Sequence, residues 1–234
     1  NRGVKELILV AQETTMYGKD IYGKKSLHIL LKKLAEIQGI QWIRILYCYP
    51  EEIYDELIET IATEKKICHY LDIPIQHASD DILKRMGRRT SNKQLREIIG
   101  KLRKRIPDII LRTTLISGFP GETQEDHDIL MKFVNEMEFD RLGVFTYSPE
   151  ENTPAASMPD QIDEQVKNFR RNEIMELQQD IVFDTTEKYV GKEFIAMIEG
   201  KISGEHAYIA RTYMDCPGVD SNIFVMTDEE LMTG

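Results

Sequence analysis

The 234-residue chain has only three cysteines, and no two of them lie close together in the sequence. Cys48, Cys68 and Cys216 form neither a CxxC nor a CxxxCxxC group, which excludes a disulfide framework and a local metal site built on cysteine. The chain also lacks any run of about 20 apolar residues, the length that an ordinary membrane span needs. These absences predict a protein of a reducing compartment, and the cytoplasm is the expected location.

Common catalytic signatures are missing as well. The sequence has no P-loop, no GxSxG elbow, no HExxH motif and no GxGxxG that opens a helix, so it matches none of the commonest nucleotide-binding, hydrolase or zinc-protease patterns. The chain begins at Asn1 without an initiator Met, a basic segment or an apolar stretch. We therefore expect no signal peptide and a start inside a longer gene product.

Charge is abundant but unevenly distributed. The formal net charge of −10 argues against a general attraction to nucleic acid. Segment 84–105, however, contains ten basic residues and the single acid Glu97. These bases form either the solvated faces of helices or a patch that meets an anionic partner such as ribosomal RNA, and the sequence leaves both alternatives open.

Short apolar runs alternate with amphipathic segments over most of the chain. The pattern predicts strands at 6–10, 42–47, 70–75, 109–116 and 142–147, and helical segments at 26–38, 53–63, 80–105, after Thr123 and at 163–186. Such alternation is typical of a parallel sheet in an α/β fold. Five strand–helix units fit a six-unit partial barrel without its first unit. On the last helix we expect the apolar face to consist of Val166, Phe169, Ile174, Leu177 and Ile181.

The pattern of predicted secondary structure changes after residue 186. Short β segments at 194–198, 207–211 and 223–226 are separated by Gly, Pro and Asp, which predicts a small all-β module. We therefore divide the chain into a domain at 1–186 and a second at 187–234. Because three strands rarely close a barrel, the second domain is expected to be truncated at its C-terminus.

Ligands of parallel α/β sheets bind at the carboxyl ends of the strands, where polar residues of this chain collect. His77 there can be a structural histidine, Glu122 a helix N-terminal charge, and Gly118 and Gly121 parts of a tight turn. Arg112 is different, because it interrupts an apolar strand and an unpaired guanidinium is costly to bury. Its partner is either an acid of the protein or the carboxylate of a cofactor.

Four segments in order resemble the methylthiotransferases of the radical S-adenosylmethionine (SAM) superfamily. They are LVAQETTMYGKD (9–20), YLDIPIQHAS continued by LKRM (70–86), RTT followed by GFPGET (112–123), and FTYSPEENTPA (145–155). Residues 187–234 resemble a truncated TRAM domain, with Arg211-Thr212 and DCPGVD (215–220) in its loop. The resemblance implies an α/β fold, a partial (β/α) TIM-like radical SAM barrel followed by a small all-β, OB-like TRAM domain.

By this resemblance the whole enzyme adds a methylthio group to the β-carbon of an aspartate in small-subunit ribosomal protein twelve, on or near the ribosome. The family uses SAM and two 4Fe–4S clusters, one of them on a CxxxCxxC loop after the first barrel strand. Neither set of cysteine ligands is found in this sequence, so the chain alone is expected to be inactive, with no metal ligand and no catalytic residue assigned.

The resemblance also assigns cofactor-binding residues. Arg112 is expected to pair with the SAM carboxylate, Gln12 and Glu13 to lie near its amino group, and Gln76 and Ser79 near the ribose or sulfonium. The residues expected to flank the adenine are Gly118, Gly121, Glu122, Phe145 and Tyr147.

Two alternatives remain. A tRNA-modifying methylthiotransferase shares the barrel and the TRAM domain, but residues 187–234 contain nine acidic and four basic residues. An acidic module is expected to repel RNA and to suit a basic ribosomal protein. The alternative of another class is a non-catalytic module that docks on the ribosome.

Overall fold

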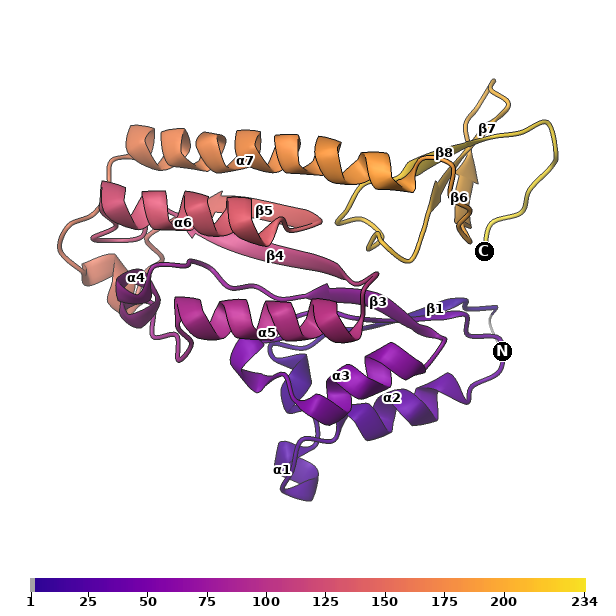
Figure 1. Ribbon diagram of the computed structural model, residues 1–234, viewed down its shortest axis with the longest axis horizontal. Coiled ribbons are helices and arrows are strands. Elements are labelled where there is room, and N and C mark those ends of the chain that lie inside the picture. Colours follow the sequence, from indigo (N-terminus) through magenta and orange to yellow (C-terminus); the bar gives the residue numbers. More distant parts are fainter. Residues whose placement is uncertain (1–2) are drawn as a thin grey trace.

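A five-stranded parallel sheet forms the first part of the molecule, and its strands lie in chain order from β1 to β5 (Figure 1). The computed structural model describes residues 3–234, so Asn1 and Arg2 of the first predicted domain lie outside the described residues. The strands are β1 (Glu6–Leu9), β2 (Trp42–Ile45), β3 (Ile67–Asp72), β4 (Ile110–Ser117) and β5 (Arg141–Thr146). The α/β class predicted from the sequence is confirmed.

Helices connect the strands and cover one face of the sheet (Figure 1). They are α1 (Lys19–Tyr22), α2 (Leu27–Ala35), α3 (Asp55–Thr63), α4 (Asp80–Arg85), α5 (Asn92–Arg105), α6 (Gln124–Met137) and α7 (Glu164–Thr186). Alternate strand residues such as Ile45, Leu71 and Leu111 pack with buried helix residues in one large apolar core. Burial of this apolar surface is the main source of the sheet's stability. Among residues 3–234, no helix is long and apolar enough to cross a membrane.

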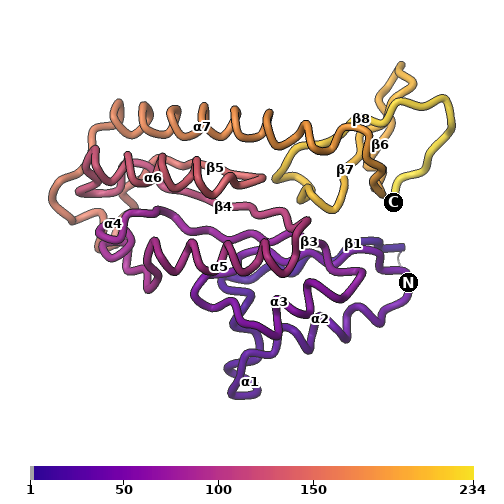
Figure 2. The backbone as a smooth tube through the Cα atoms, viewed as in Figure 1, coloured from indigo at the N-terminus to yellow at the C-terminus, as the bar shows by residue number. Residues whose placement is uncertain are grey.

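A small antiparallel sheet follows α7 and lies at one end of the molecule, near the C-terminus (Figure 2). Its strands are β6 (Met197–Lys201), β7 (Ala207–Arg211) and β8 (Ile223–Met226), in the order β6-β7-β8. The loop after β7 packs against the uncovered face of the parallel sheet, where Met214 and Cys216 join Leu46, Cys68 and Tyr70 in a second apolar cluster. We call this uncovered face the inner face.

Several predicted elements have different bounds in the structure. The strand predicted at 194–198 is β6 at Met197–Lys201, and the helix predicted at 26–38 is α2 at Leu27–Ala35. The strand predicted at 70–75 begins at Ile67 and ends at Asp72, because Pro74 has no N–H for the ladder. The helical segment predicted at 80–105 is two helices, since Gly87 adopts a φ of 73° after α4 and Ser91 caps α5 by accepting a hydrogen bond from the Gln94 N–H.

The predicted apolar face of α7 is wrong in the first half of the helix. Ile174 and Ile181 are buried as expected, but the Val166 and Phe169 side chains are exposed, and Phe169 has 61% of its surface in solvent. Lys167 and Arg170 are buried in their place, with 3% and 6% exposed. Two charged side chains therefore face the barrel where helical periodicity alone predicts apolar ones.

Candidate active-site rim

A residue with left-handed backbone follows each of three neighbouring strands. Tyr47 follows β2 with a φ of 58°, Gln76 follows β3 with a φ of 66°, and Gly118 follows β4 with a φ of 74°. Glycine adopts this conformation freely, whereas Tyr and Gln do so at a cost of about 1–3 kcal/mol each. Such residues cluster at functional sites, so the carboxyl ends of β2, β3 and β4 form a candidate rim of an active site.

Gln76 has its backbone fixed and its side-chain oxygen unpaired. Its N–H donates to the Thr114 carbonyl at 3.0 Å, and its own carbonyl accepts from the Ile116 N–H at 2.8 Å. The Oε1 atom is buried and has no hydrogen-bond partner among the residues that the structure describes. A buried acceptor of this kind costs about 1–3 kcal/mol unless a ligand donates to it. The Gln76 Oε1 is therefore a buried acceptor without a donor in the described part of the chain.

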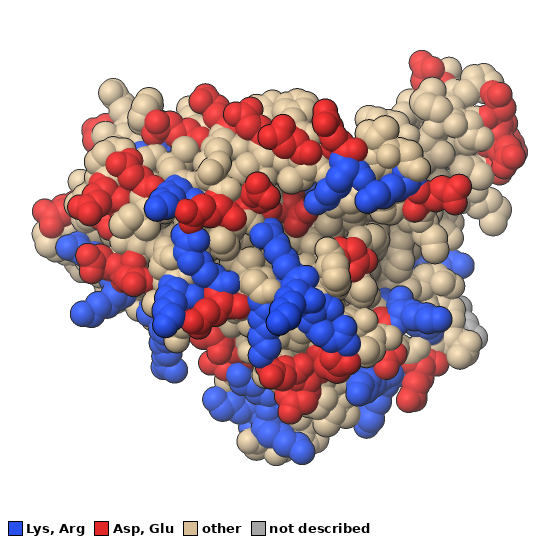
Figure 3. All heavy atoms as spheres, in the orientation of Figure 1, with Lys and Arg blue, Asp and Glu red and all other residues tan. Residues whose placement is uncertain are grey.

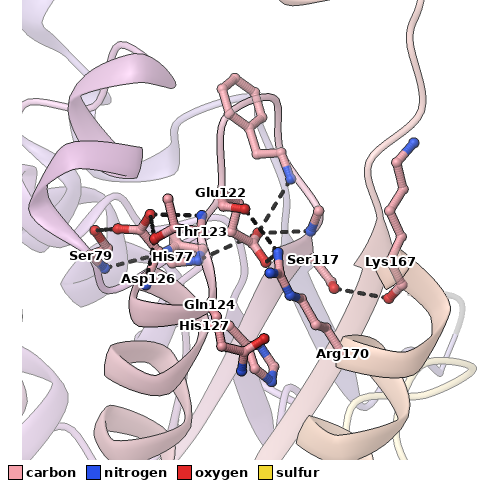
Figure 4. Close-up of polar contacts among 12 residues, drawn as sticks. His77, Ser79, Ser117, Glu122, Thr123, Gln124, Asp126, His127, Lys167 and Arg170 are labelled. Atoms are coloured by element: carbon pink, nitrogen blue, oxygen red, sulfur yellow. Dashed lines mark hydrogen bonds and ion pairs between the residues drawn. The ribbon is translucent and has the colours of Figure 1, made fainter. Parts of the chain in front are cut away.

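Glu122 is the centre of a buried network behind the rim (Figure 4). Its Oε2 accepts hydrogen bonds from the N–H groups of Gly118 at 2.7 Å and Phe119 at 3.3 Å, and its Oε1 pairs with Arg170 at 2.9 Å. Burial opposes its ionisation, but the His77 ring, the Gly118 N–H and the Arg170 guanidinium outweigh burial and lower the pKa of Glu122. Glu122 therefore holds the 118–122 turn in shape, and its carboxylate faces the protein interior.

His77 and Ser79 belong to the same network. The Ser79 N–H donates to His77 Nδ1 at 2.9 Å, which assigns the ring proton to Nε2, 3.6 Å from the Glu122 carboxylate. The Ser79 hydroxyl donates to Asp126, which also accepts from the Thr123 N–H at 2.9 Å and helps cap α6. This geometry supports the structural role that was considered for His77 from the sequence.

Arg112 lies on the inner face, in the amino-terminal half of β4 and level with Asp72. Its Nη1 is 2.9 Å from an Asp72 oxygen and its Nε is 3.4 Å from Asp220 of the loop after β7. The sequence left an acid of the protein or a cofactor carboxylate as the partner of Arg112. In the structure, its partners are acidic side chains of the protein. The burial of Arg112 opposes its charge, but the two carboxylates outweigh burial and raise its pKa.

The other residues assigned from the sequence are divided between internal contacts and the open surface. Glu13 accepts hydrogen bonds from the N–H groups of Thr15 and Tyr49, each at 2.9 Å, and Tyr147 stacks edge-on against Phe119 at 5.2 Å. Gln12 is exposed, and Phe145 is 64% exposed on the inner face, opposite Ile116 of β4. Of these residues, Phe145 is placed best to contact a flat ligand at the rim.

Sequence reasoning missed several residues of the rim and the inner face. Asp72 pairs with Arg112 and also accepts a hydrogen bond from the strained Tyr47 N–H at 3.1 Å. Asp72 interrupts an apolar strand just as Arg112 does, so the same signal would have found it. Lys167 and Arg170 gave no such signal, because charged residues are normal on any helix surface.

Metal ligands are not assembled within the described part of the chain. Cys48, Cys68 and Cys216 are all buried as free thiols, and residues 3–234 contain no group of three or more His, Cys, Asp or Glu side chains placed to hold a metal ion. Burial raises the pKa of the Cys68 thiol to about 12. Such a thiol is a poor metal ligand, because the thiolate is the binding form.

Comparison with known proteins gives related sequences of high identity. Ribosomal protein uS12 methylthiotransferase RimO of Lachnoclostridium phytofermentans is 65% identical over 232 residues, which are 99% of this chain and 53% of that protein. RimO of Clostridium perfringens strain 13 is 55% identical over 223 residues, 95% of this chain and 50% of that protein. The chain therefore spans about half the length of the curated relatives that it matches.

Solved structures support the fold alone. The Elp3 protein of Methanocaldococcus infernus superimposes with a TM-score of 0.51 at 12% identity, covering 88% of this chain and 64% of that one. Coproporphyrinogen III oxidase of Escherichia coli, a radical SAM enzyme, gives a TM-score of 0.50 at 23% identity and covers 70% of this chain and 38% of that one.

Family models match both parts of the molecule. The radical SAM superfamily model matches residues 1–134, which is more than half of the chain, and the TRAM domain model matches residues 190–234. The first match covers the sheet from β1 to β4, and the second covers the small antiparallel sheet. Membership implies SAM and an iron–sulfur cluster as cofactors. The chain belongs to the radical SAM superfamily and carries a TRAM domain after its α/β part.

Proposed function

We propose that this chain is the barrel and TRAM part of a methylthiotransferase that modifies an aspartate of ribosomal protein uS12. The observation that carries the proposal is the similarity of relatives named for this activity, which are 51–65% identical over almost the whole chain. The boundary between residues 186 and 187 is part of the proposal. A ribosomal substrate also agrees with a location in the cytoplasm.

In this proposal SAM binds at the rim formed by the ends of β2, β3 and β4. When bound there, SAM and the iron–sulfur cluster would supply radical chemistry at the substrate β-carbon, and the residues of the rim would hold and orient SAM. Gln76 lies near the ribose or the sulfonium, and its unpaired Oε1 accepts a hydrogen bond from a ribose hydroxyl. The turn held by Glu122 and the exposed Phe145 ring flank the adenine and keep water from it.

The remaining residues assigned from the sequence stay predictions with different support. Gln12 is open to a ligand, whereas the Glu13 carboxylate already accepts two backbone hydrogen bonds. Ser79 and Gly121 contribute through the network and the turn. Direct contact of Arg112 with the SAM carboxylate competes with the two protein carboxylates that pair with it.

The charge of the TRAM part supports a protein substrate. Its nine acidic and four basic residues give a net charge of −5, and Asp215 and Asp220 among them pair with Arg141 and Arg112 of the α/β part. The remaining side chains still have an excess of acids, which attracts a basic ribosomal protein and repels tRNA. We expect the chain to bind uS12 more tightly than tRNA at physiological salt, with an affinity that falls as salt rises. Preferential binding of tRNA in the same titration favours the tRNA-modifying alternative.

Contact of segment 84–105 with ribosomal RNA has weaker support. Figure 3 shows basic and acidic side chains intermixed over the face that carries α3 and α5. Arg96 pairs with Glu136, Lys101 with Asp55 and Arg105 with Glu59. These pairs leave less positive charge for a phosphate backbone than the sequence count implies.

The decisive experiment uses the whole gene product that contains this chain. The protein is reconstituted anaerobically with iron and sulfide, mixed with SAM and a reductant, and offered uS12 or tRNA as substrate. We expect mass spectrometry to find a methylthio group on an aspartate of uS12 and none on tRNA. Modification of tRNA alone would reject the proposed substrate. A protein that docks on ribosomes and modifies neither substrate would favour the non-catalytic alternative.

A further inference from the structure

The first half of α7 buries two cations where apolar residues were available. Lys167 and Arg170 are buried, while their neighbours Val166 and Phe169 are exposed. If this half of α7 served stability alone, burial of the apolar side chains would stabilise the fold more, because burying a charge is costly unless it is paired. The orientation of this half-helix therefore depends on what the two cations contact.

Lys167 contacts the residue that follows β5 and the start of the 118–122 turn. Its Nζ donates to the Tyr147 carbonyl at 3.0 Å. Its own carbonyl accepts from the Ser117 hydroxyl at 3.0 Å (Figure 4). Its aliphatic stem lies over Gly118, where a Cβ atom would come within 2.2 Å of the Lys167 Cγ. One side chain thus fixes the residues that follow two neighbouring strands.

Arg170 holds the other end of the same turn. Its Nη1 donates to the Glu122 Oε1 at 2.9 Å and to the Glu122 backbone carbonyl at 3.0 Å. Glu122 in turn accepts the Gly118 and Phe119 N–H groups. The guanidinium therefore acts on the turn backbone through the Glu122 carboxylate, which also lies 3.6 Å from the His77 ring.

We infer that Lys167 and Arg170 are positioning residues, which set the 118–122 turn and the end of β5 in the shape that receives the adenine side of SAM. The inference rests on the proposed SAM site and adds α7 to it. Neither residue touches the ligand. Both act on backbone that does, which explains why this half of α7 faces the barrel with charged side chains.

The test compares Arg170→Gln with Arg171→Gln, a neighbour on the same helix that bonds only to Asn172 among the described residues. Hydrogen exchange at the Gly118 and Phe119 amides is measured first, without cofactor. SAM affinity is then measured by calorimetry on the reconstituted gene product, next to a thermal melt. Arg170→Gln is expected to increase the hydrogen-exchange rate of both amides. It is also expected to raise the Kd for SAM about 10-fold or more, the effect usually seen when a residue that orients a direct ligand is lost. Arg171→Gln is expected to change neither.

Several outcomes would overturn the inference. A folded Arg170→Gln protein that binds SAM within twofold of wild type rejects it, even if the amides exchange faster. Equal losses of affinity in both variants reject it too. If Arg170→Gln does not fold, Arg170→Lys takes its place, because Lys keeps the charge but cannot reproduce the guanidinium geometry. An unchanged Kd in that variant is then the contrary result. Failure of the wild-type protein to bind SAM instead rejects the proposed function itself.

Lys167→Met is an independent test, because Met keeps an apolar stem over Gly118 and removes the contacts of the Lys167 Nζ with the Tyr147 carbonyl and with the exposed Glu164 carboxylate. We expect a near-native melting temperature and a weaker affinity for SAM. A fall in melting temperature with full SAM affinity would leave Lys167 as a residue of stability alone, and would remove it from the inference.

Discussion

At the scale of single residues, the rim combines strain with unpaired polarity. Tyr47 and Gln76 hold left-handed backbone without being glycine, and the Gln76 oxygen is buried without a partner among the described residues. Both features cost free energy in the ligand-free chain. Strained residues and unpaired polar atoms of this kind often occur at ligand-binding sites, which agrees with the SAM site proposed at this rim.

Replacement of Gln76 separates binding from stability. Gln76→Met keeps the length of the side chain and removes the unpaired oxygen, so we expect the free energy of unfolding to rise by about 1–3 kcal/mol or to stay unchanged. The same variant should bind SAM more weakly, because the acceptor is gone. A chemical denaturation curve and a calorimetric titration measure the two effects. Loss of stability with unchanged affinity would show that Gln76 supports the fold and not the ligand.

Glu122 makes the rim sensitive to acid. Its pKa is lower in the folded chain than the value of about 4.3 expected when unfolded, so the unfolded state takes up the proton more readily. The stabilisation by this carboxylate is complete above that value and is lost as the pH falls through the folded pKa. We expect Glu122→Gln to lower the melting temperature more at pH 6 than near pH 3.

Glu125→Gln is the matched control for this pH dependence, since Glu125 is an exposed residue in the first turn of α6. It is expected to change the melting temperature little at either pH. If the Glu122 and Glu125 variants lose the same amount at pH 6, the effect belongs to the N-terminus of α6 and not to the buried network.

At the scale of elements, sequence periodicity predicted the order of strands and helices and the layered fold. It succeeded because alternating β-branched runs and amphipathic helices bury apolar surface in only one way along a parallel sheet. It failed at α7, where buried ion pairs override the apolar pattern, and at the end of β3, where Pro74 interrupts the ladder. The roles of the predicted site residues stay predictions, and contacts such as Arg170 with Glu122 join segments far apart in sequence and follow no local pattern.

The turn after β4 gives a prediction for glycine. Gly118→Ala is expected to destabilise the chain, because the new Cβ would meet the Lys167 side chain and the residue keeps a positive φ. Gly100→Ala lies within α5 with no atom within 4 Å of the added Cβ, so it is expected to stabilise the chain by about 0.5–1 kcal/mol. Thermal melts of the two variants should therefore shift in opposite directions. A stabilised Gly118→Ala would contradict the close packing of α7 on this turn.

At the scale of the whole molecule, the loop after β7 ties the TRAM part to the inner face of the sheet. Asp220 accepts from the Tyr70 hydroxyl at 2.7 Å and pairs with Arg112, while Asp215 pairs with Arg141 at 2.6 Å. Arg112 also forms an ion pair with Asp72, and Asp72 accepts a hydrogen bond from the Tyr47 N–H. A series of polar contacts therefore connects the TRAM loop with the rim. The two parts of the chain thus share one surface, although no sequence pattern predicts their pairing.

The three cysteines can report on this docking. Cys68 and Cys216 lie in the cluster between the two parts, whereas Cys48 belongs to the large core behind the sheet. Burial raises the pKa of Cys68 to about 12 and that of Cys216 to about 11, so neither thiol reacts readily while the loop is docked. Removal of Asp220 leaves Arg112 and Tyr70 without one partner, which costs up to about 3–5 kcal/mol for a buried pair.

We therefore expect Asp220→Ala to speed the reaction of Cys68 and Cys216 with a thiol reagent at pH 8 and to leave Cys48 slow. Mass spectrometry of the labelled peptides distinguishes the three sites. Asp228→Ala is the control, because Asp228 is exposed and contacts only His206 among the described residues. Equal labelling of all three cysteines would indicate global unfolding. Unchanged labelling of Cys68 and Cys216 would show that the apolar cluster holds the loop without Asp220, and the polar chain to the rim would then have no part in docking.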